Sequence, residues 1–191
     1  MKITVVDYES GNLRSVTQAL RFAQIDPTVS GKPDQILSAD ALILPGVGSG
    51  NAAMKALEQQ KLVGAIREFI ASGRPFMGIC LGLQLLMEMT DEGGGIDCLG
   101  VIRGTVERLP SEYKVPHMGW NQVAINKEHN IMRGISSSAY FYFAHSYYSV
   151  PADPNVILGT TSYGIDFCSI LVRDNVFATQ FHPEKSGSVG L

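Results

Sequence analysis

The sequence lacks a concentration of charge of one sign. Its 191 residues include 15 Lys and Arg against 18 Asp and Glu, which gives a net charge of -3. The basic residues are scattered along the chain and form no run. Proteins that bind nucleic acid or an anionic membrane usually carry a basic patch. The sequence therefore predicts no nucleic-acid binding and no membrane binding.

Long hydrophobic runs are also missing. A helix needs about 20 mostly apolar residues to cross a bilayer, and the longest candidate, 75–83, ends at Gln84. The N-terminus reaches an acid at Asp7, which is too early for the apolar core of a signal peptide. We therefore expect a cytoplasmic protein.

Cysteine is scarce. The three cysteines, Cys80, Cys98 and Cys168, are too few and too irregularly spaced for a disulfide framework. They form no Cys-x-x-Cys pair, and the four histidines show no spacing typical of metal ligands. We predict neither a metal site nor a cofactor. What remains of interest is a single reactive cysteine with a distant histidine.

Charged residues make up only 17% of the chain, whereas hydrophobic residues make up 45%. The length suits one compact domain over 1–191. A low share of charge favours an apolar surface patch reserved for a partner protein, although a large core explains it equally well.

Short apolar runs alternate with segments of helical periodicity in the first half. The runs 3–6, 41–44 and 75–79 have the composition of buried strands, and helical patterns follow them, the last over 81–89. This alternation favours a parallel sheet covered on both faces.

The second half is rich in β-forming residues and turn signals. A hairpin is expected at 174–175, between the last two runs. We therefore predict an α/β fold whose mainly parallel sheet carries an antiparallel section in the second half. The β-rich runs are 140–143, 156–160, 167–172 and 176–180.

The segment 78–82, GICLG, is the strongest local signal. It follows an apolar strand and opens a helix, with glycines two residues before and after Cys80. This is the pattern of a nucleophile elbow, in which a tight strand-to-helix turn exposes a reactive side chain. The helix N-terminus favours the thiolate. The alternative is that Cys80 is a buried small hydrophobic residue.

The segment 181–184, FHPE, supplies a partner for this cysteine. Pro183 favours an extended conformation at His182, so that the side chains of His182 and Glu184 project to the same side. A carboxylate can then hold one imidazole nitrogen while the other faces the thiol, as in a catalytic triad. Alone, the tripeptide His182–Pro183–Glu184 is more typical of a surface turn.

The segment 45–51, PGVGSGN, also joins a strand to a helix. It does not match the dinucleotide-binding pattern, because Asn51 occupies the third glycine position, and no P-loop lysine follows. We interpret it as an oxyanion strand, in which the glycines around Val47 let a backbone N–H turn toward Cys80. The amide of Leu81 would be the second donor. A plain turn remains the alternative.

These three motifs, in this order and spacing, resemble class I (triad-type) glutamine amidotransferases. More narrowly, the chain is similar to the glutaminase subunit family of imidazole glycerol phosphate synthase, in histidine biosynthesis. Four segments carry that narrower resemblance: 7–15 (DYESGNLRS), 44–48 (LPGVG), 115–121 (VPHMGWN) and 142–147 (YFAHSY).

The resemblance implies a flavodoxin-like three-layer fold and a triad of Cys80, His182 and Glu184. It implies oxyanion donors around Val47, Gly48 and Leu81, and contacts to a bound glutamine from Gly46 and Gln84. It also implies that ammonia passes directly to a (β/α)8-barrel cyclase in a heterodimer. The residues expected to face this partner or to gate the ammonia route are Asn12, His117, Trp120, Tyr142 and His145.

Without the family, His117 and His145 are more typical of structural histidines, and Trp120 of a core aromatic residue. Three rival functions remain open: a free-standing γ-glutamyl hydrolase or peptidase, the glutaminase of vitamin B6 synthesis, and a binding module in which Cys80 only packs.

The sequence departs from the family pattern in two places. Many relatives have glycine at the position of Glu9. Relatives also usually continue beyond the position of Leu191, so we expect a missing or truncated C-terminal helix.

Overall fold

The computed structural model describes residues 1–9, 12–136 and 138–191; Ser10 and Gly11, part of the motif 7–15, lie outside the described residues. In this part of the chain the largest sheet has eight strands, in the order β2-β1-β3-β4-β14-β13-β12-β9. Its strands are β1 (Ile3–Val6), β2 (Thr28–Ser30), β3 (Ala41–Gly46), β4 (Phe76–Cys80), β9 (Ala124–Ile125), β12 (Ile157–Ser162), β13 (Asp166–Arg173) and β14 (Val176–Thr179).

The sheet is parallel from β2 to β14 and antiparallel from β14 to β9. The predicted α/β class and the antiparallel section in the second half are therefore confirmed. The predicted hairpin is also confirmed, because β13 and β14 pair with Arg173 opposite Val176.

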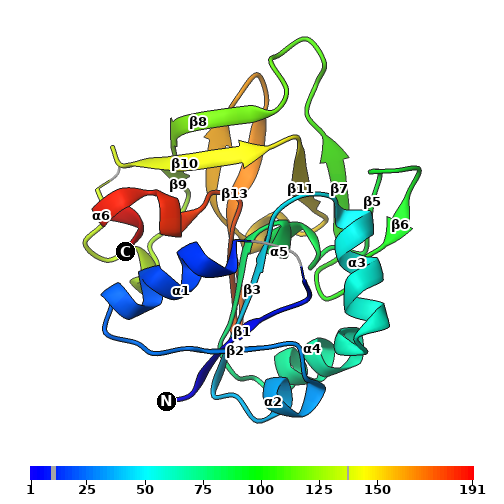
Figure 1. Cartoon of the computed structure of the whole chain (residues 1–191). Helices are drawn as coiled ribbons and strands as arrows, with labels where there is room; N and C mark the ends of the chain where they lie inside the picture. Colours follow the sequence, from blue (N-terminus) through cyan, green and yellow to red (C-terminus); the bar gives the residue numbers. More distant parts are fainter. Residues whose placement is uncertain (10–11, 137) are drawn as a thin grey trace.

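Helices cover both faces of the parallel strands, which makes the three layers that the resemblance implied. Figure 1 shows α1 on one side of the sheet and α3 and α4 on the other. The helices are α1 (Leu13–Phe22), α2 (Pro33–Leu37), α3 (Gly50–Gln59), α4 (Leu62–Ala71), α5 (Leu81–Gln84) and α6 (Gly187–Gly190), with short 3-10 turns η1 (Asn130–Met132), η2 (Pro154–Val156) and η3 (Pro183–Lys185). Among the described residues, no helix is long and apolar enough to cross a membrane.

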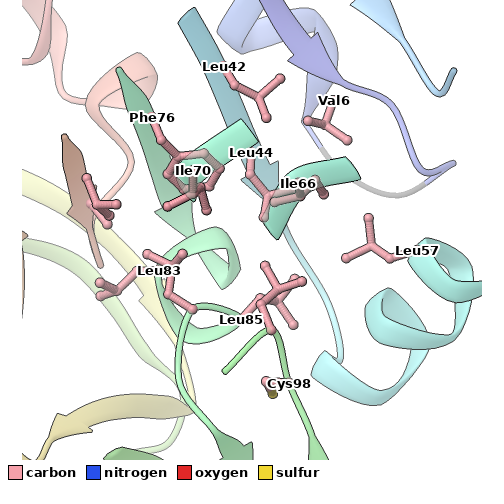
Figure 2. Close-up of a cluster of buried hydrophobic side chains, with 14 of the residues drawn as sticks. Val6, Leu42, Leu44, Leu57, Ile66, Ile70, Phe76, Leu83, Leu85 and Cys98 are labelled. Carbon is pink, nitrogen blue, oxygen red and sulfur yellow. The ribbon is translucent and has the colours of Figure 1, made fainter. Parts of the chain in front are cut away.

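Successive side chains of the parallel strands point to opposite faces, so each strand serves two cores. On the side of α2, α3 and α4, Leu42, Leu44 and Phe76 pack with helix residues such as Ile66 and Leu57 (Figure 2). On the other side, Val5, Ile43 and Ile79 pack against Val16 of α1. Burial of apolar surface on both faces holds the strand ends in fixed positions.

Two smaller sheets lie beyond the end of the parallel strands at which α5 is found (Figure 1). One is the antiparallel pair of β8 (His117–Gln122) and β10 (Tyr140–His145), called the β8–β10 ribbon below. The other has the order β11-β7-β5-β6. Its strands are β5 (Met89–Thr90), β6 (Ile96–Asp97), β7 (Gly104–Arg108) and β11 (Tyr147–Pro151).

The helix expected over 81–89 was predicted too long. The helix α5 ends at Gln84, and β5 begins at Met89. Beyond Gln84 the carbonyls of Leu85 and Leu86 accept hydrogen bonds from the backbone of Leu99 and Val101 in place of helical bonds. Both leucines are buried, so long-range packing outweighs their helical propensity.

The turn between β4 and α5 requires glycine for steric reasons. A Cβ added to Gly82 would collide with the backbone carbonyl of Leu44 in β3, and one added to Gly78 would lie 2.8 Å from the carbonyl oxygen of Gly82. Strand β3 and helix α5 therefore approach each other more closely than any larger residue permits.

We expect Gly82→Ala to lower the free energy of unfolding by about 1–3 kcal/mol, because a methyl group there must displace backbone. The matched control is Gly64→Ala in α4, where an added Cβ has nothing within 4 Å; this change should raise stability by about 0.5–1 kcal/mol, since alanine favours the helix. Urea denaturation of both variants measures the difference. Equal stability of Gly82→Ala and the unmodified protein would contradict the close approach.

Candidate active site

Cys80 lies at the strand-to-helix turn that the sequence predicts. It is the last residue of β4, and its backbone angles are φ 55° and ψ -104°. A residue other than glycine rarely adopts positive φ, and such strain is typical of functional sites. However, α5 has only four residues, so the helix dipole contributes less to the thiolate than a longer helix would.

His182 reaches the same place from the neighbouring strand. Strand β14 pairs with β4 in parallel, with Thr179 beside Ile79, so the chain beyond Thr179 continues alongside Cys80. The N–H of His182 donates to the carbonyl of Tyr142 (2.9 Å), which ties this segment to the β8–β10 ribbon. The topology therefore brings residues 80 and 182 together although 102 positions separate them (182 - 80).

Glu184 holds the imidazole. His182 Nδ1 donates to Glu184 Oε1 at 2.9 Å, and their side chains are 1% and 2% exposed. Asn12 Nδ2 donates to the same carboxylate oxygen, also at 2.9 Å. Because a carboxylate only accepts, Nδ1 carries the proton and Nε2 is left to face the sulfur.

Opposing effects set the pKa of His182. Burial alone would lower it, but side-chain hydrogen bonds to Cys80 and Glu184, together with the charges of both partners, raise it to about 9. At neutral pH His182 therefore carries a second proton and stands as an imidazolium beside the sulfur. A cysteine next to such a cation has the surroundings of a reactive thiolate.

One further side chain and one backbone carbonyl lie next to the sulfur. Gln180 Nε2 donates to Cys80 Sγ at 3.6 Å, and the carbonyl of Ala144 lies 3.9 Å from Sγ. Gln84 Nε2 donates to Gln180 Oε1 (3.1 Å) and to the carbonyl of Tyr147 (2.7 Å). Gln84 therefore lies in the same cleft as Cys80, as expected. Sequence reasoning missed Gln180, although the alternation that relates residues 182 and 184 also includes residue 180.

The glycine-rich segment after β3 lies next to the nucleophile. Gly46 pairs with Cys80 in the parallel ladder, and a Cβ added to it would lie 2.6 Å from the hydroxyl of Tyr8 and 2.8 Å from the Cβ of Leu81. Gly48 has φ +91°, a conformation favoured by glycine, and an added Cβ there meets open space. Val47 stands between these two glycines in the sequence.

A cavity of about 240 Å³ opens onto the sulfur. Its size suits a small polar molecule. Among the described residues, the one carboxylate that lines it is that of Glu92. Its Oε2 accepts a hydrogen bond from the N–H of Gly50 at 2.5 Å. Sequence reasoning also missed this residue. The lining residues are Gly48, Cys80, Leu81, Gln84, Glu92, Pro116, Met118, Ala144, His145, Ser146 and Tyr147.

His117 and His145, expected to face the partner or to gate the ammonia route, form a buried pair. His145 Nδ1 donates to the carbonyl of Tyr147 (2.9 Å), and His117 Nδ1 lies 3.0 Å from His145 Nε2. Burial lowers the pKa of His117 to about 4 and that of His145 to about 3. Both rings are therefore neutral, and His117 donates to His145.

The other residues expected at the partner or gate separate into two places. Asn12 contacts Glu184 and so belongs to the triad's surroundings. Trp120 is 55% exposed and meets Tyr142 edge-on, with ring centroids 6.0 Å apart. The alternative of a core tryptophan is therefore wrong.

In the part of the chain that the structure describes, no group of three or more His, Cys, Asp or Glu side chains could hold a metal ion.

The chain is similar to known glutamine amidotransferases over nearly its whole length. The family model described as glutamine amidotransferase class-I matches residues 4–190. Proteins named imidazole glycerol phosphate synthase subunit HisH are 48% identical in Dehalococcoides mccartyi (99% of this chain, 92% of that protein) and 49% identical in Rhodopirellula baltica (99% and 93%). The chain belongs to the class-I glutamine amidotransferases and, among them, to the HisH family.

This membership confirms the resemblance that the sequence motifs carried, and with it an enzyme of the glutamine amidotransferase type. Solved structures agree on the fold. One described as a glutamine amidotransferase has a TM-score of 0.78 at 21% identity, covering 98% of this chain and 93% of that one. PurLQS from Thermotoga maritima also has a TM-score of 0.78, at 19% identity, covering 99% and 92%.

We expect iodoacetamide at about pH 7.5 to alkylate Cys80 alone, because the thiolate is the reacting species. Burial raises the pKa of Cys168 to about 12, and burial with the charges of Asp97 and Glu92 raises that of Cys98 to about 11. Both thiols therefore stay protonated until the pH approaches those values. Peptide mapping by mass spectrometry identifies the site, with Cys80→Ala as the unlabelled control. Labelling of Cys98 or Cys168 at a similar rate in the folded protein would contradict this assignment.

Proposed function

We propose that this chain, as one domain over 1–191, hydrolyses glutamine to glutamate and ammonia through a thioester on Cys80. We further propose that it delivers the ammonia to a (β/α)8-barrel cyclase, which makes imidazole glycerol phosphate and an aminoimidazole carboxamide ribotide in histidine biosynthesis. The observation that carries the proposal is the buried Cys80–His182–Glu184 arrangement at the mouth of a cavity of amino-acid size.

In the first step the Cys80 thiolate attacks the side-chain amide carbon of glutamine. The C–N bond then breaks, and His182 gives its proton to the departing nitrogen, which leaves as ammonia. Glu184 and Asn12 keep the imidazole in the orientation that directs Nε2 at the reacting atoms.

The second step needs a neutral His182 that can act as a base. The formation of the thioester favours this neutral state. Part of the rise in the pKa of His182 comes from Cys80. Once the sulfur is a neutral thioester that contribution is lost, and burial favours the neutral imidazole. His182 then takes a proton from water, the hydroxide attacks the thioester carbon, and glutamate leaves as the thiolate re-forms.

Backbone amides near Val47, Gly48 and Leu81 are the proposed donors to the tetrahedral oxyanion, each worth about 3 kcal/mol of transition-state stabilisation. The pairing of Gly46 with Cys80 supports this role, because Gly48, two residues farther along the chain, lines the cavity that contains the sulfur. The peptide at Val47 is flanked by glycines, so it can present either its N–H or its carbonyl to the site. A partner can bias such a two-state element.

The cavity also offers recognition of a free amino acid. Gln84 lines the cavity and Gly46 pairs with Cys80 in the neighbouring strand, so both are placed to contact a bound glutamine. The carboxylate of Glu92 is opposite in charge to the α-ammonium group of glutamine. A peptide-bound glutamine carries no such cation, which favours free glutamine over a peptide substrate.

Glu92→Gln should therefore raise the KM for glutamine by about 10-fold or more and change kcat less, since it removes a charge-assisted hydrogen bond to the substrate. The matched control is Asp91→Asn, which neutralises the exposed neighbouring acid. Steady-state measurement of glutamate release gives both constants. An unchanged KM would show that Glu92 does not bind the ammonium group.

The outer face of the β8–β10 ribbon is the proposed docking surface for the cyclase. Met118, Trp120 and Tyr140 are 64%, 55% and 52% exposed, respectively, and Tyr142 packs beside Trp120. Exposed aromatic residues grouped in this way are typical of protein interfaces. Met118 and Ala144 also line the catalytic cavity, so a partner seated here would lie directly over the site that releases ammonia.

The test measures ammonia release from glutamine by the chain alone, with the cyclase, and with the cyclase and its nucleotide ligand. We expect weak activity alone, a rise with the partner, and none for Cys80→Ala. Equal rates with and without the cyclase would contradict the coupling, and unchanged activity of Cys80→Ala would contradict the thioester.

A substitution in the proposed docking surface tests the contact with the cyclase. Trp120→Ala should weaken the complex by about 30-fold, as expected for a central interface tryptophan worth about 2 kcal/mol. Phe22→Ala, an exposed aromatic residue at the end of α1, is the control and should bind the cyclase normally. Titration calorimetry compares the two.

A further inference from the structure

Gln180 is a buried polar residue next to the nucleophile. It directly follows β14, and its side chain and backbone are completely shielded from solvent. Its N–H donates to the carbonyl of Ser169 at 2.9 Å. Because Thr179 pairs with Ile79, the position after β14 lies beside Cys80. The backbone of Gln180 is therefore fixed by the same sheet that places the cysteine.

The orientation of the Gln180 amide follows from its neighbour. Gln84 Nε2 donates to the carbonyl of Tyr147 (2.7 Å), which can only accept, so this end of Gln84 is its NH2 group. The same nitrogen also contacts the Gln180 amide at 3.1 Å, so the atom that it meets is the oxygen of Gln180. The NH2 group of Gln180 is left facing Cys80 Sγ, at 3.6 Å.

This arrangement distinguishes the two protonation states of the sulfur. The NH2 group of Gln180 can only donate, so it stabilises a thiolate more than a thiol. The carbonyl of Ala144, 3.9 Å from Sγ, can only accept, and it favours the thiol. Gln180 thus supplies a neutral donor to the sulfur in addition to the charged one at His182.

We propose that Gln180 is a positioning residue for the reaction, holding the Cys80 thiolate in line with the cavity and linking it to Gln84. The proposal rests on the proposed function of Cys80 as the nucleophile. Gln180 makes this contribution through hydrogen bonds at both ends of its amide, so that neither the sulfur nor Gln84 can turn without breaking a buried bond.

The test compares the alkylation of Cys80 in Gln180→Met, which keeps the length of the side chain but has no donor, with the unmodified full-length chain. We expect the rate at about pH 7 to fall by about tenfold, the effect of one hydrogen bond to an ionised group, and the midpoint of the pH–rate curve to rise by about one unit. A rate within about twofold of the unmodified protein and an unchanged midpoint would overturn the proposal.

The matched control is Thr179→Val. Thr179 is equally buried, and its hydroxyl donates to the carbonyl of Phe181 at 2.9 Å without touching the sulfur. This variant also loses one buried hydrogen bond from the end of β14, and it should leave the alkylation curve unchanged. A shift as large as that of Gln180→Met would show that general loosening of the strand end, not the amide, controls the sulfur.

A second variant covers the case in which Gln180→Met does not fold. Gln180→Glu has the same shape and still accepts from Gln84, but at about pH 8 it places a carboxylate in front of Sγ. We expect alkylation at least as slow as in Gln180→Met; a rate near that of the unmodified protein would overturn the proposal. Alkylation needs no glutamine, so a failure of glutamine hydrolysis would reject the proposed function while these rates still decide the role of Gln180.

Discussion

Parallel pairing places β4 between β3 and β14, and the reactive groups all lie where these three strands end. Gly46 stands opposite Cys80 on one side, and Gln180 and His182 follow Thr179 on the other. The close approach of Gly82 to Leu44 allows the chain to turn at Cys80 and enter α5 without leaving the sheet. Apolar packing on both faces of these strands keeps the ends in register. The site therefore depends on backbone pairing more than on any single side chain.

Burial acts on three neighbouring histidines with opposite results. It lowers the pKa of His117 and His145 far enough to keep both rings neutral, because their partners are a carbonyl, an amide and each other. His182 is also buried, but Glu184 and Cys80 raise its pKa to about 9. The charge is thus confined to the one imidazole that touches the sulfur. A neutral His145 at the wall of the cavity adds no competing cation.

Much of the site could be predicted from local sequence. The glycines around Cys80 and the His182–Pro183–Glu184 segment describe turns whose geometry depends on neighbours in the chain, so short motifs were sufficient. The short strands β5 to β8 and β11 could not be found in this way, because their pairing depends on partners far along the chain. The same holds for α5, which long-range hydrogen bonds end early. Glu92 and Gln180 were missed because neither stands in a pattern that is distinctive without the folded sheet.

The central claim is that Cys80 carries a glutamyl thioester during turnover. The direct measurement is acid quenching of the chain, with the proposed cyclase partner and glutamine present, followed by mass spectrometry of the peptide that contains Cys80. The account predicts a glutamyl adduct on Cys80 that appears with glutamine and is absent from Cys80→Ala. Steady release of ammonia with no adduct in the unmodified protein, and with the same rate in Cys80→Ala, would contradict it.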